Sequence, residues 1–270
     1  MLSNSQIKHI NSLKLKKYRD EFKEFIAEGS TLVVDLINSR LEIRGVYALN
    51  QWITANTDLL ERNKIAVFEA GPAEMQRISA LSSPGPVLAI VKILSDAGIV
   101  LEETDADTLE QIVPGIYNEL SLMLEGISDP GNFGTILRIA DWFGIRNVFC
   151  SENCVEVYNP KVVQASMGSV ARVKVFYTDT GALLSKLAGR IPVYGTFMKG
   201  ESIYSSTLKN KGIIIIGSET RGISDTVAGY VSNRLFIPSY GSLDYGKAES
   251  LNAAVAAAIV IAEFRRPSAI

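Results

Sequence analysis

Three short segments in the second half of the chain combine polar and glycine residues that could carry chemistry. Residues 128–138 read SDPGNFGTILR, a turn-forming Asp-Pro-Gly followed by a helix start and an arginine. Residues 217–223 read GSETRGI, whose glycines allow a sharp turn or a close approach to a ligand. Ile237-Pro238 is followed by a glycine-containing loop and by ESLN at 249–252. Each segment lies where a predicted strand ends, which is where open α/β sheets bind ligands, so we expect one shared site.

Taken singly, these segments are not specific. Asp-Pro-Gly is a common turn, Gly-x-Glu is a common way to leave a strand, and Ser-Leu-Asn is a fair helix cap. Their order and spacing are more specific, because three such features must each follow a strand of one sheet. The strands and helices that would position the three segments can be predicted from the apolar runs of the chain.

Apolar runs in residues 118–270 predict those elements. The run at 213–216 is four consecutive isoleucines, as expected for a strand that is covered on both faces, and this favours a mainly parallel sheet between helices. A helix predicted at 250–265 is apolar over most of its circumference, so it packs under the sheet or against a second subunit. Strands are predicted at residues 120–124, 147–150, 173–176, 192–196, 212–216 and 234–237.

The first part of the chain predicts a smaller α/β domain. Residues 3–28 read as helical up to Gly29. Further helices are expected at 31–39, 56–62 and 73–81, and strands at 43–49, 65–68 and 87–93. The stretch 96–110 carries six acidic and no basic residues, which suits a boundary. We therefore expect domains at 1–104 and 118–270, joined by a linker at 105–117.

Composition alone does not announce a nucleic-acid partner. The 270 residues carry a net charge of −2 with a pI near 5.6, so any RNA affinity must be local. Residues 1–23 hold six basic residues against Asp20 and Glu21, which is either a solvated face or an RNA-facing one. The basic residues are Lys8, Lys14, Lys16, Lys17, Arg19 and Lys23.

Metal and membrane chemistry are not expected. Cys150 and Cys154 have no second pair to complete a zinc site, and they are expected to be buried free thiols. A single histidine, His9, cannot build a Ser-His-Asp triad or a histidine-rich metal site. The sequence contains no signal peptide and no long apolar run, so a cytoplasmic protein is expected.

In their order and spacing, the three segments resemble the three motifs of the SpoU (TrmH) family of RNA 2′-O-ribose methyltransferases, in the SPOUT superfamily. Residues 159–169 (NPKVVQASMGS) look like that family's sequence between its first two motifs, and the resemblance covers residues 118–266. Residues 1–100, with Glu28-Gly29 and VDLI at 34–37, are similar to an L30e-like substrate-binding domain that many members carry.

The resemblance implies a parallel α/β domain with a trefoil knot that binds S-adenosylmethionine, a homodimer with shared active sites, and an RNA substrate. The extra N-terminal domain favours ribosomal over transfer RNA. Arg138 and Asn132 would face the RNA, and Glu219 would join them in catalysis. Because arginine is normally always protonated, a phosphate-clamping Arg138 is preferred to its alternative role as a base. The cofactor pocket would be lined by Gly195, Thr196, Gly217, Glu219, Gly222, Ile237, Pro238, Leu251 and Asn252.

The sequence also departs from the family pattern. The second motif often reads Gly-Asn-Glu-Gly-x-Gly, whereas Ser218, Thr220 and Arg221 stand here, and residues 240–248 lengthen the third motif. Within that loop, GSLDYGKA nearly matches a phosphate-binding P-loop, but Ala248 replaces the magnesium-binding Ser/Thr. A P-loop-like nucleotide-binding protein and a non-catalytic RNA-binding module of the same fold are therefore the alternatives.

Overall fold

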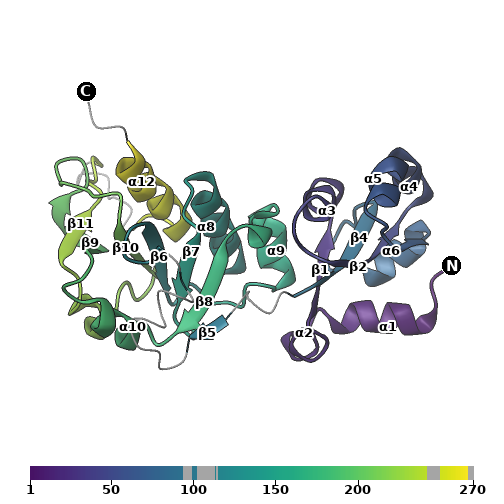
Figure 1. The fold of residues 1–270 in the computed structure, drawn as a ribbon, viewed down its shortest axis with the longest axis horizontal. Coiled ribbons are helices and arrows are strands. Elements are labelled where there is room, and N and C mark those ends of the chain that lie inside the picture. The colour runs from purple at the N-terminus through teal and green to yellow at the C-terminus, as the bar shows by residue number, and fades with distance from the viewer. Residues whose placement is uncertain (94–98, 102–112, 114, 242–249, 267–270) are drawn as a thin grey trace. The chain divides into compact units, whose positions relative to one another are not determined.

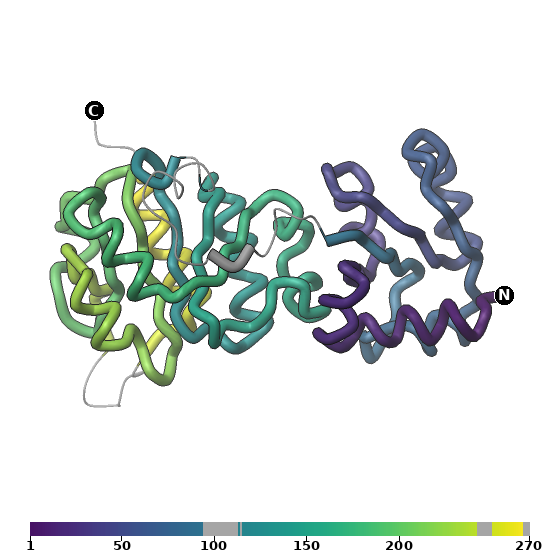
Figure 2. The backbone as a smooth tube through the Cα atoms, turned by 60° about the horizontal axis from the view of Figure 1, so that its bottom comes forward, coloured from purple at the N-terminus to yellow at the C-terminus, as the bar shows by residue number. Residues whose placement is uncertain are grey.

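The computed structural model describes residues 1–93, 99–101, 113, 115–241 and 250–266. Contacts divide the chain into two units (Figures 1 and 2). The first combines Met1–Ala97 with Glu156–Ala171, and the second combines Gly98–Val155 with Arg172–Ile270. Most of the acidic stretch and of the predicted linker lies outside the described residues.

The first unit contains a four-stranded sheet in the order β1-β4-β2-β3. Strand β4 pairs antiparallel with β1 and β2, while β3 pairs parallel with β2. Ile10 and Leu13 pack with Ile26 and Leu88 of the sheet in one buried cluster. The strands are β1 (Glu24–Glu28), β2 (Ile43–Ala48), β3 (Val67–Glu69) and β4 (Val87–Lys92).

Most of the helices and strands that were predicted for the first unit are present in the structure. The prediction was wrong at residues 24–28, which form β1 instead of the end of a helix. Phe25, Ile26 and Ala27 are all buried, and such a short continuous apolar run does not distinguish a buried strand from a helix. The helices are α1 (Asn4–Ser12), α2 (Lys16–Phe22), α3 (Ser30–Ile37), α4 (Asn50–Ala55), α5 (Thr57–Arg62), α6 (Pro72–Ile78) and α9 (Pro160–Ser166).

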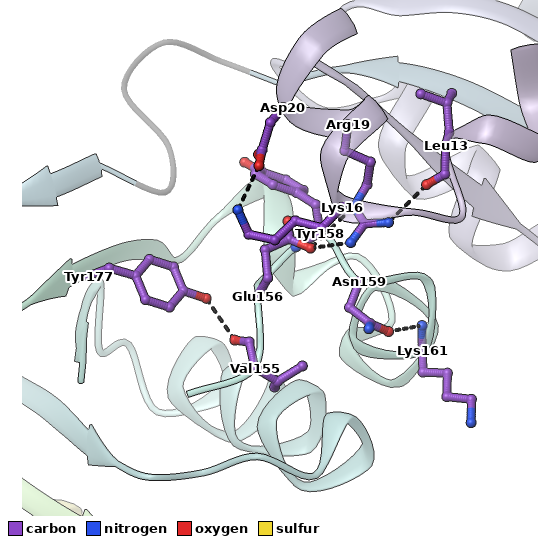
Figure 3. A network of polar contacts seen from close by, with 10 residues as sticks. All are labelled: Leu13, Lys16, Arg19, Asp20, Val155, Glu156, Tyr158, Asn159, Lys161 and Tyr177. Carbon is purple, nitrogen blue, oxygen red and sulfur yellow. Dashed lines mark hydrogen bonds and ion pairs between the residues drawn. The ribbon is translucent and has the colours of Figure 1, made fainter. Parts of the chain in front are cut away.

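Three of the six basic residues near the N-terminus make polar contacts with other residues of the protein. Arg19 is only 2% exposed and donates to the carbonyl of Leu13 and to the Glu156 carboxylate, at 2.9 and 2.6 Å (Figure 3). Lys16 pairs with Asp20 at 2.6 Å, and Lys14 Nζ donates to the carbonyl of Ser79 at 2.7 Å. Burial lowers the pKa of Lys14. Arg19 and Lys14 therefore serve the fold, whereas the Lys16–Asp20 pair is exposed, so the basic run is structural only in part.

The second unit contains a seven-stranded sheet in the order β11-β9-β10-β6-β7-β8-β5, and every neighbouring pair is parallel. The mainly parallel sheet predicted from the apolar runs is thus confirmed. Residues 99–101, which the sequence analysis assigned to the first domain, form β5 and pair with β8. The strands are β5 (Ile99–Leu101), β6 (Leu120–Glu125), β7 (Asn147–Cys150), β8 (Lys174–Thr178), β9 (Val193–Ser202), β10 (Gly212–Gly217) and β11 (Asn233–Phe236).

Helices cover both faces of this sheet. On one face, α10 (Thr180–Leu187) and α11 (Asp225–Ala228) pack on alternate residues of the strands, such as Val193 and Ile215. On the other face, α8 (Pro130–Trp142) lies beside α12 (Ala253–Arg265) (Figure 1). Phe264 of α12 meets the ring of Tyr194 edge-on at 4.8 Å. Across the described residues, no helix combines the length and the apolar character needed to cross a membrane.

Candidate active site

The three motifs meet through a chain of side-chain hydrogen bonds. Asn132 Nδ2 donates to Glu219 Oε1 at 2.6 Å, and Asn252 Nδ2 donates to Asn132 Oδ1 at 2.8 Å. The backbone N–H of Ala253 donates to the same Glu219 oxygen at 3.1 Å. One residue from each motif thus takes part, although 87 residues separate Asn132 from Glu219 and 120 separate it from Asn252.

The first motif folds as a capped helix start. Asp129 is the N-cap of α8, and its side chain accepts the backbone N–H of Asn132 at 2.7 Å. Pro130 occupies the first helical position, where its missing N–H costs nothing. This cap places Asn132 in the first turn of α8, near the end of β6.

Arg138 lies further along α8 and is exposed. It makes no hydrogen bond or ion pair with any other described residue. Trp142 lies one turn beyond Arg138 on the same helix and is 84% exposed. The structure therefore brings Asn132, but not Arg138, into direct contact with Glu219, and leaves the guanidinium available for a ligand.

The second motif is a closed turn that only glycine permits at its ends. The backbone N–H of Gly222 donates to the carbonyl of Ser218 at 2.8 Å, and Gly222 has a positive φ of 66°. A Cβ atom at Gly217 would collide with the backbone of Gly222. The turn presents Glu219 at its tip, and the second carboxylate oxygen, Oε2, has no hydrogen-bond partner among the described residues.

The third motif forms the N-terminus of α12. Asn252 is its N-cap and accepts the backbone N–H groups of Ala254 and Val255 at 3.0 and 3.3 Å. The Glu219 carboxylate binds the Ala253 N–H at the same helix end, which the helix dipole favours. Leu251 is 44% exposed, and Glu249 lies outside the described residues, as does most of the lengthened loop.

The remaining predicted cofactor residues lie at the same edge of the sheet. Gly195 of β9 pairs with Ile215 of β10 and with Arg234 of β11, so these three residues lie level with one another near the end of β10, although β9 itself runs on to Ser202. Thr196 Oγ1 donates to the carbonyl of Ile215 at 3.1 Å. A Cβ at Gly195 would lie 2.6 Å from the Phe197 ring. Ile237 and Pro238 directly follow β11, so the structure gathers the strand ends but shows no contact from these residues to Glu219.

The two cysteines are free and buried, as predicted. Burial raises the pKa of Cys150, whereas a hydrogen bond with the Cys150 thiol lowers the pKa of Cys154 to about 7. Within the described ranges, no three or more His, Cys, Asp or Glu side chains lie together in a group that could hold a metal ion. Sequence reasoning missed Glu125, which binds Ser224 beyond the second motif, because a single acidic residue at a strand end has no signature.

A parallel sheet whose strand ends bring these three motifs together defines a class of RNA-modifying enzyme. Residues 119–262 match the model of the SpoU rRNA Methylase family, and residues 4–89 match that of the MRM3-like substrate binding domain. The chain belongs to the SpoU rRNA methylase family. The resemblance inferred from the motifs is thereby confirmed.

Individual relatives and solved structures match nearly the whole length of the chain. The 23S rRNA (guanosine(2553)-2′-O)-methyltransferase RlmP of Bacillus subtilis is 24% identical over 97% of this chain and 96% of its own length. A TrmH-family protein from Porphyromonas gingivalis is 37% identical with a TM-score of 0.80, covering 99% of this chain and 100% of that one. An AdoMet-bound rRNA methyltransferase from Sinorhizobium meliloti is 26% identical with a TM-score of 0.79, covering 98% and 96%.

Proposed function

We propose that the protein transfers a methyl group from S-adenosylmethionine to a ribose 2′-hydroxyl of ribosomal RNA. The observation that carries this proposal is the hydrogen-bonded chain from Asn252 through Asn132 to Glu219, which joins the three motifs. Arg138, on the same helix as Asn132, has no hydrogen-bond or ion-pair partner among the described residues. The relatives named for 2′-O-methylation of 23S rRNA and the match of residues 4–89 to a substrate-binding domain favour ribosomal over transfer RNA.

The strand ends fit the cofactor. S-adenosylmethionine supplies an electrophilic methyl group on a sulfonium centre. A Cβ at Gly217 would collide with the Gly222 backbone, and one at Gly195 would lie 2.6 Å from the Phe197 ring, so the chain requires glycine at two of the positions proposed to line the cofactor. The free oxygen of Glu219 adds one acceptor. The residues proposed to hold the cofactor are Gly195, Thr196, Gly217, Glu219, Gly222, Ile237, Pro238, Leu251 and Asn252.

Asn132 and Arg138 have different roles toward the RNA in this proposal. Asn132 is fixed by Glu219 and Asn252, so its amide is positioned before substrate arrives. Arg138 donates to no other described residue and can hold a phosphate beside the target ribose with bidentate hydrogen bonds. It would stabilise the charge that develops as the hydroxyl loses its proton. A literal base role for Arg138 is the alternative.

Methyl transfer to RNA can be tested directly. The purified protein is incubated with labelled S-adenosylmethionine and ribosomal RNA from a strain that lacks the gene, and the product is mapped by mass spectrometry. We expect one 2′-O-methylated nucleotide in ribosomal RNA and none in transfer RNA. Cofactor binding without transfer to either RNA would support the non-catalytic alternative.

Arg138→Ala tests the clamp within the same assay. Removing a charged hydrogen-bonding group costs about 1.5–3 kcal/mol, so kcat/KM for RNA should fall by about 10- to 100-fold. The affinity for S-adenosylmethionine should stay unchanged. Arg138→Lys should recover part of the loss, since a lysine still binds phosphate as a point charge. Full activity of the alanine variant would exclude Arg138 from the reaction.

A homodimer is also proposed, built on the exposed faces of α8 and α12. One side of α12 packs in the core, but Val255 remains 47% exposed, and Trp142 on the neighbouring α8 is 84% exposed. Val255 lies near the start of α12 and Trp142 at the end of α8, and the two helices run side by side from Asn132 and Asn252 to Phe143 and Arg265, so the proposed surface extends along the helix pair. Sedimentation should show a dimer that Trp142→Glu and Val255→Glu convert to a monomer. The trefoil knot and the cytoplasmic location remain predictions from the sequence.

A further inference from the structure

The end of strand β6 is tied to the segment that follows the second motif. Glu125 is the last residue of β6 and is half-buried. Its Oε1 accepts the hydroxyl of Ser224 at 2.5 Å, and its Oε2 accepts the backbone N–H of the same residue at 3.1 Å. A carboxylate that receives both donors of one residue holds it in position and in orientation.

Ser224 is well placed to transmit this restraint. It is the N-cap of the short helix α11, and its hydroxyl oxygen accepts the backbone N–H of Val227 at 3.4 Å. Only Ile223 separates it from Gly222, which closes the turn of the second motif. The position of Ser224 therefore sets where the turn from Gly217 to Gly222 ends.

The turn is consequently held at two points by the first motif and its strand. At its tip, Glu219 is bound by Asn132 of α8, and beyond its end Ser224 is bound by Glu125 of β6. The pairing of Gly217 with Glu125 in the parallel register of β10 and β6 fixes the start of the turn against the same strand end. The backbone between these anchors is the part proposed above to contact the cofactor.

We propose that Glu125 is a positioning residue for methyl transfer, which sets the affinity for S-adenosylmethionine by anchoring the turn of the second motif through Ser224. This role rests on the proposed function, because the turn is taken to hold the cofactor. Glu125 itself contacts no reacting atom in this scheme. It acts on cofactor binding more than on the rate of transfer from the bound complex.

The test compares Glu125→Ala, Glu125→Gln and a matched control, Glu119→Ala, in the full-length protein. Glu119 directly precedes β6 at the opposite end of the strand and pairs with the exposed Arg146 at 2.7 Å, so it reports the loss of a carboxylate away from the site. The dissociation constant for S-adenosylmethionine is measured by calorimetry, and KM and kcat by the transfer assay. Thermal unfolding of each variant reports stability separately.

Glu125→Ala should weaken cofactor binding by about 10-fold, the effect of losing a charged hydrogen-bond acceptor. Its kcat at saturating cofactor should change by less than about 3-fold. Glu125→Gln should bind almost as tightly as the unchanged protein, since its oxygen can accept the Ser224 N–H while its amide donates to the hydroxyl oxygen. Glu119→Ala should bind the cofactor normally.

Ser224→Ala provides a second variant in case Glu125→Ala unfolds. It keeps the backbone N–H and loses the hydroxyl, so its cofactor affinity should lie between those of the unchanged protein and Glu125→Ala. Combining the two substitutions should add little to Glu125→Ala alone, because both remove the same link.

The proposal is overturned if Glu125→Ala lowers the melting temperature but binds S-adenosylmethionine as tightly as Glu119→Ala. It is also overturned if glutamine fails to restore binding in a folded protein. Absence of methyl transfer to RNA by the unchanged protein would count against the proposed function alone, since the effect of Glu125 on cofactor binding would still be measurable.

Discussion

Asn132 occupies the centre of the site because an amide can donate and accept at once. It gives a hydrogen bond to the Glu219 carboxylate and receives one from the Asn252 amide. A carboxylate could only accept, and a hydroxyl is too short to span both partners. The three residues were predicted from their motifs, but their direct contact was not, because spacing along the chain says nothing about which side chains bond to one another.

Asn132→Asp is therefore expected to be more harmful than Asn132→Ala. The aspartate would place a second negative charge against Glu219, and two carboxylates in contact must share a proton. At pH 8 we expect turnover to fall by about 10-fold for alanine and further for aspartate.

The pH dependence separates this cause from a simple loss of packing. The second negative charge is relieved when one carboxylate of the pair takes up a proton, so Asn132→Asp should regain activity relative to Asn132→Ala as the pH falls from 8 to 5. Methyl transfer measured across that range checks it. Equal activity ratios at both pH values would contradict the repulsion.

The turn of the second motif shows how far an element can be predicted and where prediction stops. The strand β10 follows from four consecutive isoleucines, and the glycines mark a turn at its end. The tight closure of Gly217 on Gly222 is visible only in three dimensions. The extension of β9 to Ser202 was missed for a related reason, since its exposed residues pair through the backbone and carry no apolar pattern.

Gly217→Ala should open this turn, because its Cβ would collide with backbone that cannot rotate away. We expect cofactor affinity to fall by about 5- to 150-fold, as overpacking costs of 1–3 kcal/mol imply. Gly229→Ala is the matched control, since Gly229 has a helical φ of −65° and a Cβ there meets ordinary contacts. If both variants bind S-adenosylmethionine alike, the turn does not shape the site.

For the molecule as a whole, the family match and the structural units do not coincide. The SpoU match runs from residue 119 to 262, yet residues 156–171 within it belong to the first unit. There, α9 contacts β1, and Glu156 is bound by the buried Arg19. The sequence could not reveal this, because residues 159–169 resemble the methyltransferase family and carry no sign of their packing partner. A variant that lacks residues 1–100 would also lose the strand β1 that α9 packs against, so its activity would not report the role of the N-terminal domain alone.

Arg19→Met should show how much this ion pair stabilises the first unit. The substitution removes the guanidinium that donates to Glu156 Oε2 and to the Leu13 carbonyl, and we expect a loss of about 2–4 kcal/mol in the free energy of unfolding. The double variant Arg19→Met/Glu156→Leu should recover part of that loss, because the unpaired charge is gone. Denaturant unfolding of the three proteins measures both effects, and an unchanged unfolding midpoint in Arg19→Met would exclude the pair as a support.

Because residues 156–171 belong to the first unit, that unit cannot finish folding during synthesis until part of the second unit has been made. Domains generally fold as units from the N-terminus while the ribosome is still translating. Here the first unit lacks the Glu156 carboxylate until residue 156 has emerged and α9 until residue 166 has emerged, by which time β5, β6, α8 and β7 of the second unit have already been made. Until then the Arg19 guanidinium lacks its carboxylate partner. Nascent chains halted so that residues 156–171 are either still inside the ribosome or fully emerged should therefore differ sharply in how well residues 1–97 resist proteolysis.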